Sequence, residues 1–410
     1  MQRAAPNGDR LTSLQLVAYG LPGLPLAVLL LPLFVILPTY YADDLGLGLA
    51  TVGAVLLFAR IWDVVTDPLI GLLSDRTRSR FGQRRPWLVA GAPLVIAGTV
   101  ALFNPPPDVN GTHLLFATVI LYLGGTMILL PYTAWAAELS RDRHEKSRIA
   151  AAREIAMVLG TLLAIAMPAA LGLSRIDVVH GISWALAILI PLSVCIAVCA
   201  LPDQPPTRIP VVHLRTSLST LWENRHFRLL VSAYFTNGVA YGLPATLFLL
   251  YAQHILNDPN AAWMLLTIYF GACIAGLPAW LALSRKIGKR KSWIIAMAMA
   301  AAGFWPAALL GEGDIGWFIV PSIQADLAEK DAQANGIRRT GTMFGIWGVA
   351  TKIPLALGVG IAFPILDLAG FDAVSTDNNA TALAVLAVLY GLVPVLFKLF
   401  AIWIVRQIPD

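Results

Sequence analysis

The chain has 410 residues, of which 58% are hydrophobic and 13% are charged, and its mean hydropathy is +0.72. Soluble domains carry roughly a quarter charged residues, so the composition excludes an ordinary soluble domain and indicates a membrane protein. The net charge of +5 is explained by the basic loops described below, so it gives no indication of nucleic-acid binding.

Eleven apolar stretches, each close to the ~20 residues that a membrane helix needs, follow one another along the chain. They cover residues 14–40, 47–74, 87–103, 113–138, 149–173, 181–201, 229–253, 261–284, 293–310, 342–366 and 381–405. The apolar runs are continuous and do not alternate with polar residues, which favours helices over a barrel. The sequence therefore predicts an all-α, polytopic membrane protein.

Basic residues alternate from one inter-helix loop to the next, which predicts the orientation. The N-terminus and residues 76–85, 141–148, 208–228 and 285–291 are rich in Lys and Arg, whereas the opposite loops are acidic. The first stretch lacks a cleavage pattern and is interpreted as an uncleaved helix. We expect a protein of the cell inner (plasma) membrane with both termini in the cytoplasm.

The second stretch carries three charged residues, Arg60, Asp63 and Asp67. At about 100° per residue they fall within roughly 60° of one another, on one helix face. Burying an ionised side chain in hydrocarbon costs a few kcal/mol, so such residues usually have a function. The alternative is an ion-pair network that only fixes helix packing.

A loop motif occurs twice. Residues 80–87 read RFGQRRPW and residues 286–293 read KIGKRKSW, at an offset of 206 residues. This repeat predicts two six-helix halves, residues 1–201 and 227–410, joined by a cytoplasmic linker at 202–226, the parallel-repeat plan of major facilitator transporters.

Nothing in the sequence predicts an enzyme or a bound cofactor. Cys195, Cys199 and Cys273 lie in apolar stretches without metal or redox spacing, so we interpret them as small hydrophobic residues. The sequence contains no nucleotide-binding loop, nucleophile elbow or metal cluster.

Several motifs together resemble the glycoside-pentoside-hexuronide:cation symporters, the melibiose permease family. They are ARIWD at 59–63, TDPLIG at 66–71, DRTRSRFG at 75–82, RRPW at 84–87, PYTAW at 131–135, RE at 153–154, and RRTG at 338–341 followed by Lys352. The resemblance covers most of the chain and implies the major facilitator fold and cation-coupled transport. Animal lysophospholipid transporters are related more distantly.

The resemblance implies a coupling-cation site formed by Asp63, Asp67, Thr66 and Thr126. A hard cation such as Na⁺ prefers several oxygen ligands, and paired carboxylates can hold a proton instead because one pKa rises. The coupling ion, Na⁺ or H⁺, therefore stays open. The resemblance also places the positive charges of Lys352 and Arg153 beside these carboxylates.

Further residues are candidates for solute binding or coupling: Arg60, Arg153, Glu154, Lys352, Tyr132, Trp135 and Asn237. Each has a structural alternative, because long charged side chains reach the membrane interface and aromatic or amide residues often serve in helix packing.

The sequence departs from the family pattern in two places. The first concerns two sugar-binding aspartates of the melibiose permease, which correspond to Ala27 and Leu129 here. Desolvated hydroxyls need polar partners, so a melibiose-like galactoside is not supported, and an apolar first helix suits a less polar or amphipathic solute.

The tenth helix is the second departure. Only about 15 residues, including Pro321, separate Asp314 from Lys330, and at 1.5 Å per residue they fall short of the ~30 Å hydrocarbon core. The helix is either short and bent or lost. The charge pattern favours a short crossing with Arg338 and Arg339 in the cytoplasm.

We therefore expect a monomeric secondary transporter that couples Na⁺ or H⁺ to the movement of a small organic solute, a sugar or glycoside first of all. A lipid or amphipathic-solute transporter, or a transport-inactive relative that lacks a full tenth helix, is the alternative.

Overall fold

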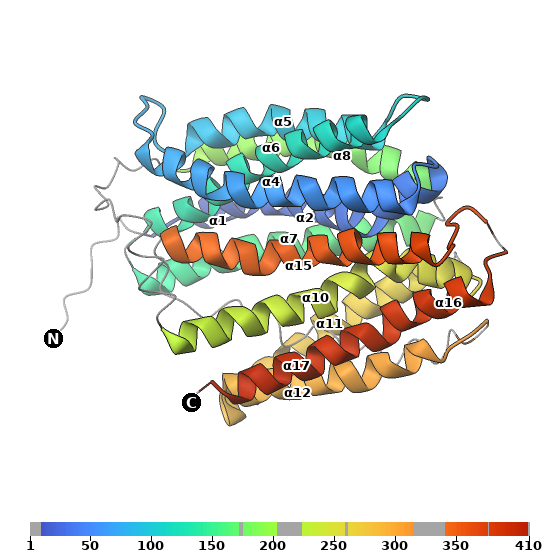
Figure 1. Ribbon diagram of the computed structural model, residues 1–410. Helices are drawn as coiled ribbons and strands as arrows, with labels where there is room; N and C mark the ends of the chain where they lie inside the picture. The colour runs from blue at the N-terminus through green and yellow to red at the C-terminus, as the bar shows by residue number, and fades with distance from the viewer. Residues whose placement is uncertain are drawn as a thin grey trace. The chain divides into compact units, whose positions relative to one another are not determined.

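The structure is a computed structural model that describes residues 10–140, 142–171, 175–202, 224–258, 261–312, 314, 341–375 and 377–408. Within these residues all regular structure is helical, as Figure 1 shows. By length and composition, seven described helices could cross a membrane: Ser13–Asp44, Leu49–Arg76, Arg85–Phe103, Gly111–Ala136, Glu145–Met167, Ile176–Ala200 and Ala380–Arg406. The prediction of an all-α membrane protein is confirmed.

Spatial contacts divide the chain into two compact units. The first comprises Met1–Leu33, Val65–Pro168 and Leu173–Val211, and the second comprises Phe34–Val64, Ala169–Gly172 and Val212–Asp410. Helix α4 (Leu49–Arg76) therefore contributes its first part to the second unit and its remainder to the first. The predicted six-helix halves stay a prediction, and most of their linker lies outside the described residues.

The first apolar stretch is a broken helix. It forms α1 (Ser13–Gly20), α2 (Gly23–Leu31), a π-helical turn at Pro32–Ile36, the short α3 (Leu37–Thr39) and a second π-helical turn at Tyr40–Asp44. Prolines explain part of the irregularity, since each removes a backbone donor and crowds the preceding turn. π-Helical turns inside helices are frequent near functional sites.

In the first unit, α5 (Arg85–Phe103) lies along α6 (Gly111–Glu138) and also contacts α8 (Arg175–Ala200) (Figure 1). Glycines permit the close approach of α5 and α6. A Cβ at Gly98 would lie 2.6 Å from the Leu121 nitrogen, and one at Gly124 would lie 2.6 Å from the Val95 nitrogen. Such contacts are typical of membrane helices that pack through small residues. The long α7 (Arg143–Leu171) completes this set.

In the second unit, α10 (Arg225–His254) packs against α15 (Gly341–Leu368) and α17 (Val393–Arg406), and α12 (Lys289–Phe304) packs against α17 (Figure 1). A buried cluster that includes Tyr234, Trp280 and Trp293 joins α10, α11 (Ala261–Ile287), α12 and α17. A 3₁₀ turn at Trp305–Ala308 ends α12. The last span is α16 (Ala380–Ala387), a π-helical turn and α17.

Each of the eleven predicted apolar stretches is helical over most of its described residues. The region of the predicted short tenth helix, including Pro321, Arg338 and Arg339, lies outside the described residues, so its path stays a prediction.

The two loop motifs share one backbone feature. Gly82 and Gly288 hold corresponding places in the two loop motifs, and both adopt positive φ, 100° and 82°. Glycine tolerates this conformation without strain, and a helix begins shortly after each residue, α5 at Arg85 and α12 at Lys289.

Candidate cation and solute site

The charged face of α4 points into the protein, as its sequence predicts. Arg60, Asp63 and Asp67 are only 5%, 2% and 8% exposed, and Thr66 is also buried. The opposite face carries exposed apolar side chains such as Val65 and Leu69. A membrane helix is stable in this arrangement because lipid contacts the apolar face and the charges find partners inside.

In the second unit, the Asp63 carboxylate has two cationic partners. Its Oδ2 accepts a hydrogen bond from Arg60 Nη1 at 3.0 Å and lies 2.9 Å from Lys352 Nζ, which comes from α15. The Arg60 guanidinium also lies over the Phe34 ring, 4.8 Å from its centroid. Lys352 thus lies beside a helix-two carboxylate, as the resemblance implied.

The Arg60–Asp63–Lys352 group carries two formal positive charges and one negative charge. A cation that competes for Asp63 would change the balance of this group. Ion pairs of this kind can exchange partners when a ligand arrives.

In the first unit, Asp67 pairs with α6. The Thr126 hydroxyl donates a hydrogen bond of 2.8 Å to Asp67 Oδ1, and both side chains are buried. The hydroxyl oxygen keeps lone pairs that can coordinate a cation. Because Asp63 and Asp67 lie one turn apart on α4, this helix offers carboxylate oxygens, the ligand type that a hard cation prefers.

The candidate solute residues Arg153 and Glu154 form an ion pair on α7, with Arg153 Nη2 2.5 Å from Glu154 Oε1. Their side chains are 22% and 59% exposed, far more than the charges of α4. Exposure of a carboxylate in the span Glu145–Met167 is unusual for a residue that serves only packing. The proximity of Arg153 to the α4 carboxylates stays a prediction.

The Tyr132 side chain is not open to a solute in this structure. It is fully buried, and its hydroxyl donates to the Tyr19 carbonyl, while the Tyr19 hydroxyl donates to the Tyr132 carbonyl at 3.1 Å. The two rings lie 4.7 Å apart. These reciprocal bonds join α1 to α6, which favours a packing role.

Trp135 and Asn237 are also buried. The Trp135 indole nitrogen has no hydrogen-bond partner among the described residues, so it can still donate to a ligand. Asn237 Oδ1 lies 3.4 Å from Lys398 Nζ, which comes from α17. Lys398 was not among the predicted site residues, although its apolar neighbours on both sides indicate a charge within the membrane, and it is only 5% exposed.

Position 27, which the resemblance matched to a sugar-binding aspartate, is used for helix packing. Ala27 is 1% exposed, and a Cβ added at Gly160 of α7 would lie 3.1 Å from the Ala27 Cβ and 2.3 Å from the Leu24 oxygen. A larger side chain at position 27 would press on α7. The other position, Leu129, is 38% exposed and apolar.

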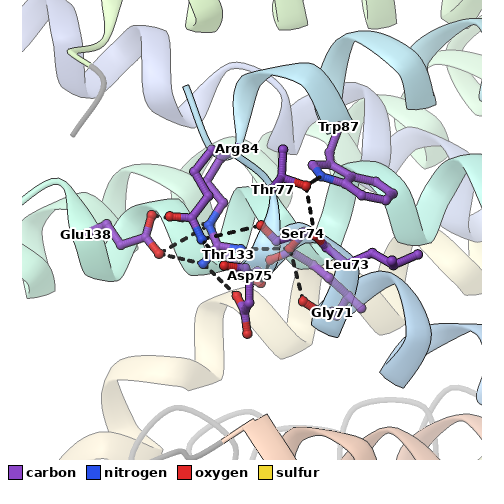
Figure 2. A network of polar contacts seen from close by, with 11 residues as sticks. Gly71, Leu73, Ser74, Asp75, Thr77, Arg84, Trp87, Thr133 and Glu138 are labelled. Atoms are coloured by element: carbon purple, nitrogen blue, oxygen red, sulfur yellow. Dashed lines mark hydrogen bonds and ion pairs between the residues drawn. The ribbon is translucent and has the colours of Figure 1, made fainter. Parts of the chain in front are cut away.

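The first loop motif forms a compact polar network in the first unit (Figure 2). Arg84, whose side chain is 2% exposed, lies 2.6 Å from Glu138 Oε1 and 2.8 Å from Asp75 Oδ1, and it donates to Ser74 Oγ at 2.7 Å. Burial alone would lower the pKa of the Arg84 guanidinium, but its bonds to Glu138 and Asp75 outweigh burial and raise that pKa. The network ties α4 and α6 to the start of α5.

The corresponding arginine of the second motif has different partners. Arg290 Nε donates to the Val405 carbonyl at 3.2 Å and its Nη2 to the Arg406 carbonyl at 2.6 Å. It therefore caps the end of α17, where carbonyl groups lack helical partners and attract positive charge.

Comparison with known proteins gives one consistent result. The profile of a family described as MFS/sugar transport protein matches residues 18–409. The inner membrane symporter YicJ of Escherichia coli (strain K12) is 25% identical over 406 residues, which cover 90% of this chain and 85% of that protein. The isoprimeverose transporter of Lactiplantibacillus pentosus is 24% identical over 399 residues, covering 88% and 82%.

A more distant animal protein matches over nearly the full chain. The sodium-dependent lysophosphatidylcholine symporter 1 of Gallus gallus is 20% identical over 474 residues, which cover 98% of this chain and 88% of that protein.

Solved structures confirm the fold. A crystal structure of a mutant form of the nucleoside transporter NupG has a TM-score of 0.74 at 12% identity and covers 97% of this chain and 100% of its own. A bacterial homologue of the human peptide transporters PepT1 and PepT2 has a TM-score of 0.70 at 14% identity, with 96% and 98% covered.

Proposed function

Because this chain belongs to the MFS/sugar transport protein family, we propose that it is a symporter that couples an inward cation gradient to the uptake of a small organic solute. The observation that carries the proposal is the buried pair Asp63 and Asp67 on one face of α4. The relatives that match over most of their length include an inner membrane symporter, a glucuronide carrier homologue and an isoprimeverose transporter.

The coupling cation, Na⁺ or H⁺, binds at Asp63 and Asp67 with oxygens of Thr66 and Thr126. Thr126 already bonds Asp67, and rotation of its hydroxyl would turn a lone pair toward the ion. The proposal includes no tightly bound cofactor. The only ion in it is the coupling cation, which is transported and must therefore bind and leave.

Arg60 and Lys352 form ion pairs with the Asp63 carboxylate in this structure. When the cation binds, it competes with Lys352 for the carboxylate, and the released ammonium group becomes available to the solute. Solute and cation would thereby favour each other's binding, which is the thermodynamic requirement for symport.

The solute binds near Arg153 and Glu154, whose ion pair offers donors and acceptors for hydroxyl or carboxylate groups. The Trp135 indole N–H, which has no partner among the described residues, and the Asn237 amide are secondary candidates, whereas Tyr132 contributes through helix packing. A sugar or glycoside is the solute class that the relatives' names favour.

A lipid or amphipathic solute is the second candidate. The apolar residues Ala27 and Leu129 favour it, as does the similarity to the lysophosphatidylcholine symporter of Gallus gallus. A transport-inactive relative is the third candidate, because loss of the tenth helix, the alternative to a short one, would remove one wall of the C-terminal half.

We place the protein in the cell inner membrane with both termini and the basic loops on the cytoplasmic side, because the Lys and Arg residues accumulate in alternate loops. It acts as a monomer that contains two six-helix halves.

Solute counterflow and gradient-driven uptake in proteoliposomes test this function. Labelled β-glucuronide, isoprimeverose and lysophosphatidylcholine would be offered with an inward Na⁺ gradient, an inward H⁺ gradient or neither. Accumulation of one solute that depends on one gradient supports symport and identifies the ion. Uptake that ignores both gradients would contradict coupling, and counterflow of none of the three solutes would favour the inactive relative.

A further inference from the structure

Two cysteine residues lie one helical turn apart on the outer face of α8. Cys195 and Cys199 are both exposed and free of a disulfide, and their spacing of four residues puts both side chains on one face of the helix. The same face carries the exposed apolar residues Ile188, Leu192 and Ile196. Because α8 is long and apolar enough to cross a membrane, we expect this face to contact lipid.

The spacing of the two cysteines does not suit a disulfide bond within the helix. Helix residues four apart have Cβ atoms about 5–6 Å apart, whereas a disulfide needs about 3.5–4.5 Å. An S–S bond would therefore unwind the helix. Insertion of one further atom between the sulfurs removes this strain, because two bonds then span the gap.

We propose that Cys195 and Cys199 form a chelating dithiol for a soft, thiophilic centre, specifically a trivalent organoarsenical. Thiolate sulfur selects soft partners, and a pyramidal arsenic(III) atom holds two sulfurs on the same side, as the two thiols stand on α8. An arsenoxide, R–As=O, reacts with both thiols. Two As–S bonds form, the As=O bond breaks, and the oxygen leaves as water with the two thiol protons, so no atom changes its oxidation state.

The surroundings favour an organic arsenical over a hydrated metal ion. The neighbouring side chains are apolar, and a hydrated ion would lose its water there at a high cost. A lipid-permeant aryl arsenoxide instead dissolves in the bilayer and packs its ring against Leu192 and Ile196, beside the thiols.

Phenylarsine oxide added to the full-length protein, with Cys273→Ser as the background, tests the proposal. Intact-mass measurement should show one phenylarsenic group per chain, with the loss of two titratable thiols. A small dithiol should release the group, whereas a monothiol at the same thiol concentration should not, because only a dithiol replaces both bonds. Two arsenic groups per chain, one on each thiol, would overturn the proposal.

Variants separate chelation from simple thiol reactivity. Cys195→Ser or Cys199→Ser should weaken binding about 100-fold or more, since the second bond of a chelate forms at high effective concentration. The double variant Cys199→Ser with Ala200→Cys keeps two thiols but places them about 140° apart around the helix, so it should lose affinity equally. Wild-type affinity in this register variant would refute the proposal. Melting temperatures and maleimide labelling of the unfolded chains establish that each variant is folded and carries the intended thiols.

Discussion

Lys352 of α15 and Arg60 of α4 contact the same oxygen, Asp63 Oδ2, at 2.9 and 3.0 Å. The carboxylate that the proposed cation needs is therefore occupied by two of the protein's own cations. A coupling ion must displace at least one of them, and Lys352 is the better candidate because its side chain is 23% exposed, against 7% for Arg60.

Removing either negative charge should abolish coupling. Asp63→Asn and Asp67→Asn keep the side-chain volume but lose the charge that attracts the cation, so we expect no solute accumulation above equilibrium. Solute exchange can persist because the solute residues are intact. Uptake driven by Na⁺ and H⁺ gradients in proteoliposomes measures this, and Asp177→Asn, in the first turn of α8, is the matched control. Unchanged accumulation in both variants would contradict the cation site.

Removing the ammonium of Lys352 should strengthen cation binding. Lys352→Met keeps the length of the side chain but removes the competitor for Asp63, and we expect the cation concentration for half-maximal solute binding to fall by about tenfold, or ~1.4 kcal/mol. Lys352→Arg keeps the charge and serves as control. An equal cation dependence in wild type and Lys352→Met would mean that the ion pair does not compete with the cation.

Thr126→Val should lower the affinity of the site for the cation but should not abolish cation binding. The substitution keeps the shape and removes the hydroxyl that bonds Asp67 at 2.8 Å. A hydrogen bond to a charged group contributes about 1.5–3 kcal/mol, so activation by the cation should require roughly 10 to 100 times more of it. Thr126→Ser should restore most of the affinity. If serine and valine behave alike, the hydroxyl takes no part.

The Arg84 network should contribute to stability more than to transport specificity. Arg84→Ala leaves Glu138 without its bidentate partner and should lower the free energy of unfolding by roughly 3 kcal/mol. This value is the lower end of the range for a broken buried ion pair, because the other partner, Asp75, is 43% exposed. Arg84→Lys should rescue little, since a lysine lacks the planar fork. Thermal unfolding in detergent measures both variants, and a melting temperature equal to wild type would show that the network is dispensable.

The loop before α15 should lie in the cytoplasm. Charge placement predicts that the chain crosses the membrane between Asp314 and Lys330, although the crossing is short and its mismatch costs fractions of a kcal/mol per Å. Asn335→Cys, in a chain whose natural cysteines are replaced by serine, should resist a membrane-impermeant maleimide in intact cells and react after the cells are opened. Labelling in intact cells would reverse this topology.

The helices and the charged face of α4 were predictable from sequence because both depend on local rules. Apolar length predicts membrane helices, and helical periodicity placed Arg60, Asp63 and Asp67 on one face. The two loop motifs also match in backbone conformation, since a glycine at a tight turn can adopt positive φ, and Gly82 and Gly288 both do so.

The partners of these residues were harder to predict, because they come from helices far away in the chain. Lys352 was placed beside the helix-two carboxylates by family resemblance, and nothing local to α15 indicates that it reaches Asp63. The bond between Lys398 and Asn237 and the reciprocal bonds of Tyr19 and Tyr132 depend on which helix faces pack together. Periodicity identifies a polar residue on a face but does not identify its partner.

The two copies of the loop motif face different evolutionary constraints. Arg84 depends on the side chains of Glu138 and Asp75, so a single codon change in α4 or α6 can remove a partner. Arg290 binds the main-chain oxygens of Val405 and Arg406, which every amino acid supplies. A substitution at Arg406 therefore leaves the anchor of Arg290 in place, whereas a substitution at Glu138 or Asp75 removes a partner of Arg84.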